Sequence, residues 1–373
     1  MNKFVLSALA LTTAGGLATA GTGSEEWLTL DREIESLAST QAPASTSGVT
    51  VSGFIRSSYL NSGDREVGPE DNDLSGFSLD NARVNVAGSV GDYSLYVQIE
   101  AASPDESSSG TGDGLVPDPF GTGVSSGGSL YVLDAYGAWN ISDQFKLTMG
   151  QFRSPFFGNS QLDENELLFL DRTATAHLWA ERDLGVMLSG QYDVLGWWLA
   201  AQNGLDGAGD DMAFSARVAF DAMGAQSRVE GAYGASEETA LGISAGYYQD
   251  DDSVQDDLAA WNIEAKFGMG PIYLYGSYVD HDDGYGAEFG PSFTSGPAIM
   301  ALQGSFMFVP DRWEAAIRYE DLDDDDSTDF LTFGLNYYAV GHDAKWQLNY
   351  MKGSSDNDSF DVDVFGIGLT VGV

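Results

Sequence analysis

The stretch Ala344-Lys345-Trp346-Gln347-Leu348-Asn349-Tyr350 alternates apolar and polar side chains. Successive side chains of a β-strand point to opposite faces, so Trp346, Leu348 and Tyr350 would share one face. The polar residues between them would share the other face. The same alternation recurs at 313–320 and 261–267. A repeat that is apolar on the outside, polar inside and about ten residues long is typical of a transmembrane β-barrel.

Sixteen segments from residue 49 onward show strand-like composition, and the gaps between most of them are alternately short and long. Short turns at one end and long loops at the other are the arrangement of an outer-membrane barrel. We therefore predict an all-β fold, a transmembrane antiparallel β-barrel of 16 strands. The segments lie near 49–61, 76–90, 92–102, 129–141, 144–153, 183–193, 195–203, 212–220, 239–250, 258–268, 271–281, 297–309, 312–321, 328–340, 343–353 and 360–373.

One gap, 221–238, breaks the alternation because it should be a short turn and is not. Two interpretations are open. Either an extra hairpin lies there, with Arg228 to Tyr233 as a strand, or the turn is elaborated. The last segment alternates up to Val373, which fits a barrel that closes on its C-terminal strand.

The first twenty residues have the features of a cleaved secretory signal. Lys3 supplies the positive start, residues 4–11 are the short apolar run, and Ala18-Thr19-Ala20 is a small-residue cleavage site. The apolar run is too short to span a bilayer. We expect residues 1–20 to be removed and residues 48–373 to form the barrel.

Residues 21–47 are predicted to be a periplasmic helical stub and linker. Trp27, Leu30, Ile34 and Leu37 are spaced three, four and three apart, which is the spacing of a coiled coil. Two heptads are marginal in isolation, so the stub would need an existing oligomer to hold it together. A frayed helix on a tether is the alternative.

Charge and composition exclude several classes of function. The formal net charge is −41, and nucleic-acid binding requires a basic face. The chain has no Cys, which excludes disulfides and thiolate metal sites. Its three His residues do not accompany a recognisable nucleophile, so no enzyme activity is expected. The acidic runs do not match a Ca²⁺-loop spacing, and we interpret them as solvated loops, with no metal or cofactor predicted.

Many of the few basic residues lie at the same alternate strand positions as the polar residues. Seven of them share parity with the polar faces, which would place them in the lumen, since a lipid-facing Arg or Lys at mid-membrane costs about 2–4 kcal/mol. Two roles are open: lining the pore, or pairing with inward acids such as Glu100, Glu264, Glu314 and Glu320. The seven are Arg56, Arg83, Lys146, Arg217, Lys266, Arg318 and Lys345.

The third long loop carries the most specific motifs. It starts from Gly150-Gln151-Phe152-Arg153-Ser154-Pro155-Phe156 and returns through Arg182-Asp183-Leu184-Gly185-Val186, and Asn203-Gly204 follows the seventh strand. With these motifs the chain resembles the phosphate-selective porin O and P family. The resemblance implies a trimeric, 16-stranded outer-membrane porin whose third loop folds into the lumen and narrows the pore.

The resemblance makes Arg153, Arg172 and Arg182 candidates for a positive constriction on this loop. Each of these arginines could equally be a structural partner for Asp163, Glu166 or Asp171. One departure from the family concerns its lysine cluster, which comes from a later loop. The corresponding stretch here, residues 250–257, has no Lys.

The predicted function is therefore a porin of the bacterial outer membrane, a passive diffusion channel for small hydrophilic, charged solutes, including anions such as phosphate. Its expected partners are these solutes, outer-membrane lipid and two further copies of the chain in a homotrimer. Two alternatives are an envelope-tethering protein that uses the 21–47 stub and a cation-preferring general porin. Lumenal bases favour anions, whereas acidic vestibules concentrate cations at low salt.

Overall fold

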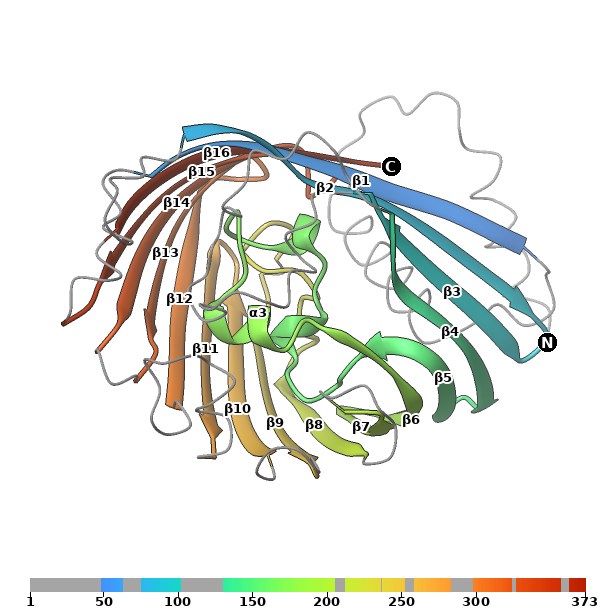
Figure 1. Cartoon of the computed structure of the whole chain (residues 1–373). Coiled ribbons are helices and arrows are strands. Elements are labelled where there is room, and N and C mark those ends of the chain that lie inside the picture. The colour runs from blue at the N-terminus through green and yellow to red at the C-terminus, as the bar shows by residue number, and fades with distance from the viewer. Residues whose placement is uncertain are drawn as a thin grey trace. The chain divides into compact units, whose positions relative to one another are not determined.

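The computed structural model describes residues 48–62, 75–101, 130–204, 212–235, 237–251, 258–282, 298–323, 327–356 and 362–373. Within them, sixteen strands form one closed barrel in which each strand pairs with its sequence neighbours (Figure 1). The strands are β1 (Gly48–Ser62), β2 (Ser75–Val90), β3 (Tyr93–Glu100), β4 (Tyr131–Ser142), β5 (Phe145–Arg153), β6 (Arg182–Tyr192), β7 (Leu195–Gln202), β8 (Ala213–Met223), β9 (Ala240–Asp250), β10 (Leu258–Met269), β11 (Ile272–His281), β12 (Ala298–Val309), β13 (Trp313–Asp321), β14 (Asp329–Val340), β15 (Ala344–Ser354) and β16 (Val362–Gly372). The predicted 16-strand barrel is confirmed.

The barrel closes by antiparallel pairing of its first and last strands. Phe54 of β1 lies opposite Gly372 of β16, and the pairing continues to Ser62 opposite Val364. The backbone N–H of Val373 donates to the carbonyl of Gly53 at 2.9 Å. Alternation up to the final residue therefore has a structural cause, because the C-terminal strand is needed to leave no open edge.

Side chains alternate between the two faces of the wall, as the sequence predicted. In β15, Trp346 and Tyr350 are exposed on the outer face, whereas Lys345, Gln347 and Asn349 are buried on the inner face. Exposed apolar side chains cover the outside of every strand pair in the same way, and Met149 is 73 % exposed. A continuous apolar exterior is stable only in contact with lipid.

Outward aromatic residues gather near both ends of the strands. One group lies near the short turns: Tyr93, Trp139, Phe145, Tyr192, Trp313 and Trp346. A second group lies near the long loops: Phe77, Tyr247, Trp261, Tyr350 and Phe365. Aromatic residues in two bands are what membrane barrels place at the two membrane–water interfaces.

Tight turns join the strands at the end where β1 begins and β16 ends. Gly91 and Gly341 have φ of 58° and 53°, a left-handed conformation that glycine adopts without steric cost. Short turns face the periplasm in barrels of this type. Longer connections join the strands at the opposite end, so the predicted alternation is confirmed for the described connections.

The connection between β8 and β9 is the exception at the short-turn end. The structure has no strand in the described residues of 224–239, so the alternative of an extra hairpin at 228–233 is wrong and the turn is elaborated. We call residues 224–239 the inner turn. Residue 236 lies outside the described part.

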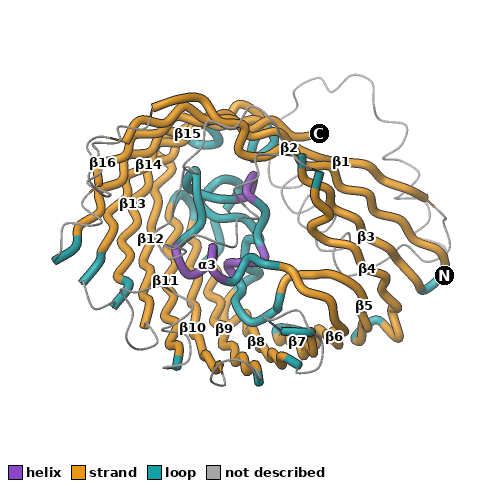
Figure 2. Tube along the Cα trace, in the orientation of Figure 1, coloured by secondary structure: helices purple, strands orange, loops and turns teal. Residues whose placement is uncertain are grey.

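The lumen is occupied by the connection between β5 and β6, residues 154–181, which we call the inner loop. It lies inside the ring of strands and contains three short helices, η2 (Asn159–Gln161), η3 (Glu164–Glu166) and α3 (Ala174–Leu178) (Figures 1 and 2). The loop predicted to fold into the lumen does so. Among the described residues, no helix is long and apolar enough to cross a membrane. The predicted signal at 1–20 and the stub at 21–47 lie outside the described residues.

Candidate pore constriction

The inner loop packs its apolar side chains against one side of the barrel wall. Phe156 and Trp179 have ring centroids 4.2 Å apart, and Tyr248 of β9 stands edge-on to Trp179 at 4.8 Å. Trp179 also stacks on His281 of β11, with centroids 5.9 Å apart. These rings are buried, so burial of apolar surface holds the loop to the wall.

Inward-facing glycines make room for this packing. A Cβ atom on Gly246 of β9 would lie 2.1 Å from the carbonyl oxygen of Phe156. A Cβ on Gly368 of β16 would lie 2.3 Å from Leu170. The wall thus lets the loop approach at positions where any larger residue would collide with it.

Wall carboxylates bind the backbone of the inner loop. Glu264 of β10 accepts hydrogen bonds from the N–H groups of Gly158 at 2.6 Å and Asn159 at 2.9 Å. Glu320 of β13 accepts the N–H of Ala174, at the start of α3, at 2.6 Å. A loop with little regular structure leaves many backbone groups without local partners, and these acids supply the acceptors.

Wall bases and amides bind the loop carbonyls. Lys345 donates to the carbonyl of Leu167 at 2.6 Å, and Asn336 donates to that of Leu168 at 2.8 Å. Arg318 donates to the carbonyl of Asp171 at 3.0 Å. The inner loop is therefore held from β10, β13, β14 and β15 by side chains of both charges.

A cluster of arginines surrounds Glu164 at the other side of the loop. Arg172 lies 2.6 Å from the Glu164 carboxylate, Arg153 lies 3.8 Å from it, and Arg83 of β2 donates to it directly. Burial raises the pKa of the Glu164 carboxyl, but the charges of Arg172, Arg83 and Arg153 lower it by more, so its pKa lies well below the ordinary value. Glu164 is thus a fixed negative charge that cross-links the loop to β2 and β5.

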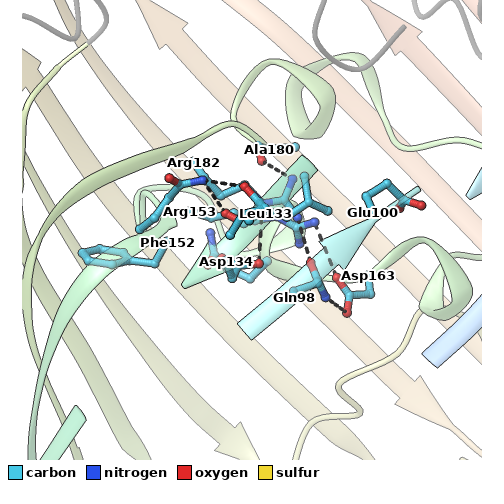
Figure 3. A network of polar contacts seen from close by, with 12 residues as sticks. Gln98, Glu100, Leu133, Asp134, Phe152, Arg153, Asp163, Ala180 and Arg182 are labelled. Carbon is cyan, nitrogen blue, oxygen red and sulfur yellow. Dashed lines mark hydrogen bonds and ion pairs between the residues drawn. The ribbon is translucent and has the colours of Figure 1, made fainter. Parts of the chain in front are cut away.

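Asp163 begins a chain of contacts that extends this cluster to three more strands. Gln98 of β3 donates to its carboxylate at 3.1 Å, and Arg83 lies 3.1 Å from it. Arg182 of β6 donates to the Gln98 oxygen at 3.2 Å and lies 3.6 Å from Asp134 of β4. Figure 3 shows Gln98 of β3, Asp134 of β4, Arg153 of β5 and Arg182 of β6 converging beside Asp163 of the loop.

The structure places seven of the ten predicted site residues in such contacts, and they lie at or near the inner loop. Arg56 lies 3.7 Å from Asp80, and Arg318 lies 2.8 Å from Glu320. Of the alternative partners, Asp163 is confirmed for Arg153, whereas Arg182 pairs with Asp134 instead. These seven are Arg56, Arg83, Arg153, Arg172, Arg182, Arg318 and Lys345.

The other three predicted residues differ from these seven. Lys146, Arg217 and Lys266 are partly exposed on the inner face, and none has an ion pair within the described part of the chain. Lys146 and Lys266 lie near the short-turn ends of β5 and β10, whereas Arg217 lies near the middle of β8. Among the ten predicted site residues, these three are the ones for which the described residues supply no ion pair.

Each of the three bases lies over an aromatic ring of a neighbouring strand. Lys146 is 5.9 Å from the ring centroid of Tyr136, and Lys266 is 6.0 Å from that of Tyr275. Arg217 is closer, 4.0 Å from the centroid of Trp198. The negative face of a ring attracts a cation and fixes its position without neutralising its charge.

Two of these bases share one row of paired residues across the sheet. Lys146 pairs with Ser189, Ser189 with Trp198, and Trp198 with Arg217. Three strand spacings separate the two bases, which is about 14 Å. Arg217 also lies against the inner loop, since a Cβ on Gly158 would be 2.6 Å from its Nη1.

The sequence placed the wall acids in the lumen but did not predict that they bind the backbone of the inner loop and the inner turn. Glu264, Glu314 and Glu320 were expected as partners of bases, but only Glu320 has an ion pair in the described residues. Glu264 and Glu314 accept from backbone N–H groups, and Glu230 of the inner turn does the same. Strand parity indicates that the wall acids point inward, and nothing in the pattern identifies their partners.

A closed 16-strand barrel with an apolar exterior, two aromatic bands and an inward loop defines an outer-membrane diffusion channel of the porin class. The family model of the phosphate-selective porins O and P matches residues 55–275, more than half of the chain. The chain belongs to this family, and it is a porin of the bacterial outer membrane through which small hydrophilic solutes diffuse passively.

Solved porins share the fold at low sequence identity. The anion-selective porin of Comamonas acidovorans is 11 % identical, with a TM-score of 0.55 over 88 % of this chain and 100 % of that one. The outer-membrane channel DcaP of Acinetobacter baumannii is 14 % identical, with a TM-score of 0.55 over 88 % and 99 %. The trimer form of OmpT of Vibrio cholerae is 12 % identical, with a TM-score of 0.51 over 88 % and 100 %. No curated protein matches the chain.

Proposed function

We propose that the channel prefers small anions and that Lys146, Arg217 and Lys266 are the bases that the anion meets. The observation that carries this proposal is the absence, within the described residues, of any ion pair to these three side chains. A base without an ion pair in a water-filled lumen with low-dielectric walls attracts anions more strongly than the same base in bulk water.

The other seven predicted bases contribute less to this preference because each is engaged by a carboxylate or a carbonyl. Arg83, for example, is 2 % exposed and contacts three carboxylates. Selectivity then comes from two elements, the width left beside the inner loop and the sign of the unpaired charges. In this proposal the chain is a channel with no catalytic role.

A reversal-potential measurement across planar bilayers in a KCl gradient tests the proposal. Wild-type channels should reverse at a potential of the sign expected for chloride preference. Replacing the three bases together, K146Q/R217Q/K266Q, should shift the potential towards potassium preference. K352Q is the matched control, because Lys352 is exposed on the outer face of β15. An unchanged potential in the triple variant would reject these bases as the selectivity elements.

We also propose that the channel assembles as a homotrimer. The support is family membership together with the trimer form recorded for the structural neighbour OmpT. Gentle extraction followed by mass determination in detergent should give three chains per particle. A monodisperse single-chain particle that conducts ions would contradict the trimer.

A further inference from the structure

The inner turn enters the lumen from the short-turn end, opposite to the end from which the inner loop enters. It connects β8 and β9 at a position where the other described connections at this end are tight turns. Its described residues have no regular secondary structure, yet Gly231 and Ala232 are buried. A segment this irregular can be buried only if other groups satisfy its backbone.

Glu230 joins the inner turn to the inner loop. Its carboxylate accepts hydrogen bonds from Asn159 Nδ2 at 2.7 Å and from the backbone N–H of Leu168 at 2.8 Å. Its own N–H donates to the carbonyl of Glu166 at 3.0 Å. Glu230 is 1 % exposed, and it therefore fixes the loop at points on both sides of η3.

Ala232 and Tyr233 of the inner turn contact the barrel wall. The N–H of Ala232 donates to Glu314 of β13 at 2.5 Å, and Tyr338 of β14 donates to the same carboxylate at 2.5 Å. The ring of Tyr233 packs on that of Tyr338, with centroids 4.7 Å apart. The inner turn is thus a bridge from β13 and β14 to the inner loop.

We infer that the inner turn is a latch that sets the width of the open pore by holding the inner loop in place, with Glu230 as its positioning residue. The inference rests on the porin function and goes beyond it, because nothing in the diffusion mechanism requires a second inward segment. The carboxylate is satisfied by N–H donors and has no ion pair in the described part of the chain. Loss of its two acceptor oxygens would leave buried donors unpaired and free the loop.

Single-channel recording of Glu230→Ala tests the latch. The released loop should give a higher conductance and additional substates than the wild type. Glu230→Gln should stay close to the wild type, because Asn159 Oδ1 has no hydrogen-bond partner and a rotated Asn159 amide can accept from the new amide. Glu237→Ala is the matched control, since Glu237 is an exposed acid on the same inner turn.

A compensating pair separates the latch from a general loss of structure. Asn159→Asp places a second carboxylate beside Glu230, and the repulsion should release the loop and raise the conductance. Adding Glu230→Gln to this variant supplies an amide donor to the new carboxylate. The double variant should therefore return to the wild-type conductance, which a merely destabilised barrel would not do.

Two results would overturn the latch. One is a wild-type conductance and noise in both Glu230→Ala and Asn159→Asp. The other is a raised conductance in Asn159→Asp that Glu230→Gln does not reverse. Either result leaves the diffusion channel intact, because wild-type protein would still show step conductance.

Discussion

The carboxylate of Glu264 in β10 lies 2.6 Å from the backbone nitrogen of Gly158, and it accepts the hydrogen bond of this N–H group. The two residues are 106 positions apart in the chain, and the Glu264 side of the contact is buried. This hydrogen bond is an example of the contacts that position the inner loop in the barrel. The wall supplies charged side chains, the loop supplies backbone groups, and the position of the loop is decided by their pairing.

Replacing Glu264 should therefore loosen the inner loop. Glu264→Ala leaves the N–H groups of Gly158 and Asn159 without their acceptor, and each unpaired buried donor costs about 1–3 kcal/mol. Amide hydrogen exchange at 156–162 should become faster in the variant. Glu181→Ala is the control, since Glu181 is an exposed acid on the same loop. Equal protection in the two variants would show that Glu264 does not hold the loop.

The close approach of the inner loop to inward-facing glycines gives a second prediction. Gly246→Ala places a methyl group 2.1 Å from the carbonyl of Phe156, so the inner loop must move away from β9. Gly268→Ala is matched to it, because Gly268 also faces inward on the adjacent strand β10 and a Cβ there meets nothing within 4 Å. Limited proteolysis of the folded barrel should cut the inner loop of G246A and spare that of G268A. Resistance in both variants would contradict the close approach.

The pH dependence of the loop should follow Glu166, which lies outside the strands. Burial and the neighbouring charge of Asp163 raise the pKa of Glu166 from its ordinary value of 4.5 to about 7. The docked loop therefore binds a proton that the free loop releases, and the stability from this group is present below about pH 4.5 and lost as the pH rises through about 7. The opposite dependence of Glu164 belongs to a lower pH window, because its pKa lies well below the ordinary value.

Hydrogen exchange of residues 163–166, followed from pH 4.5 to 8 and corrected for the intrinsic exchange rate, measures this effect. Protection should fall with rising pH in the wild type. Glu166→Gln should flatten the profile, because the amide does not titrate. Parallel profiles in the wild type and the variant would assign the pH dependence to another group.

Much of the barrel could be predicted from the sequence because strand parity is a local property. Trp346 and Lys345 alternate for the same reason that neighbouring side chains of any strand do, and lipid on one side makes the alternation strict. The strand bounds differ from those predicted by at most three residues. The resemblance of residues 150–204 to a porin family identified the inner loop, and the structure confirms that this loop folds inward.

The contacts of the constriction could not be predicted because they join residues that are far apart in the sequence. Strand parity predicted that Lys345 lies in the lumen, but its hydrogen bond to the carbonyl of Leu167 depends on the path of the inner loop. The irregular gap at 221–238 indicated something unusual, yet no pattern in it indicated that Glu230 would reach Leu168. Long-range pairing of this kind is set by tertiary packing, which periodicity does not encode.

The most direct test of the channel and its proposed selectivity is a planar-bilayer recording of the purified wild-type protein under a KCl gradient. We expect discrete conductance steps and a reversal potential of the sign set by chloride, because Lys146, Arg217 and Lys266 have no ion pair within the described residues. A reversal potential of the sign expected for potassium preference would contradict the anion preference. An absence of any step conductance would contradict the channel itself.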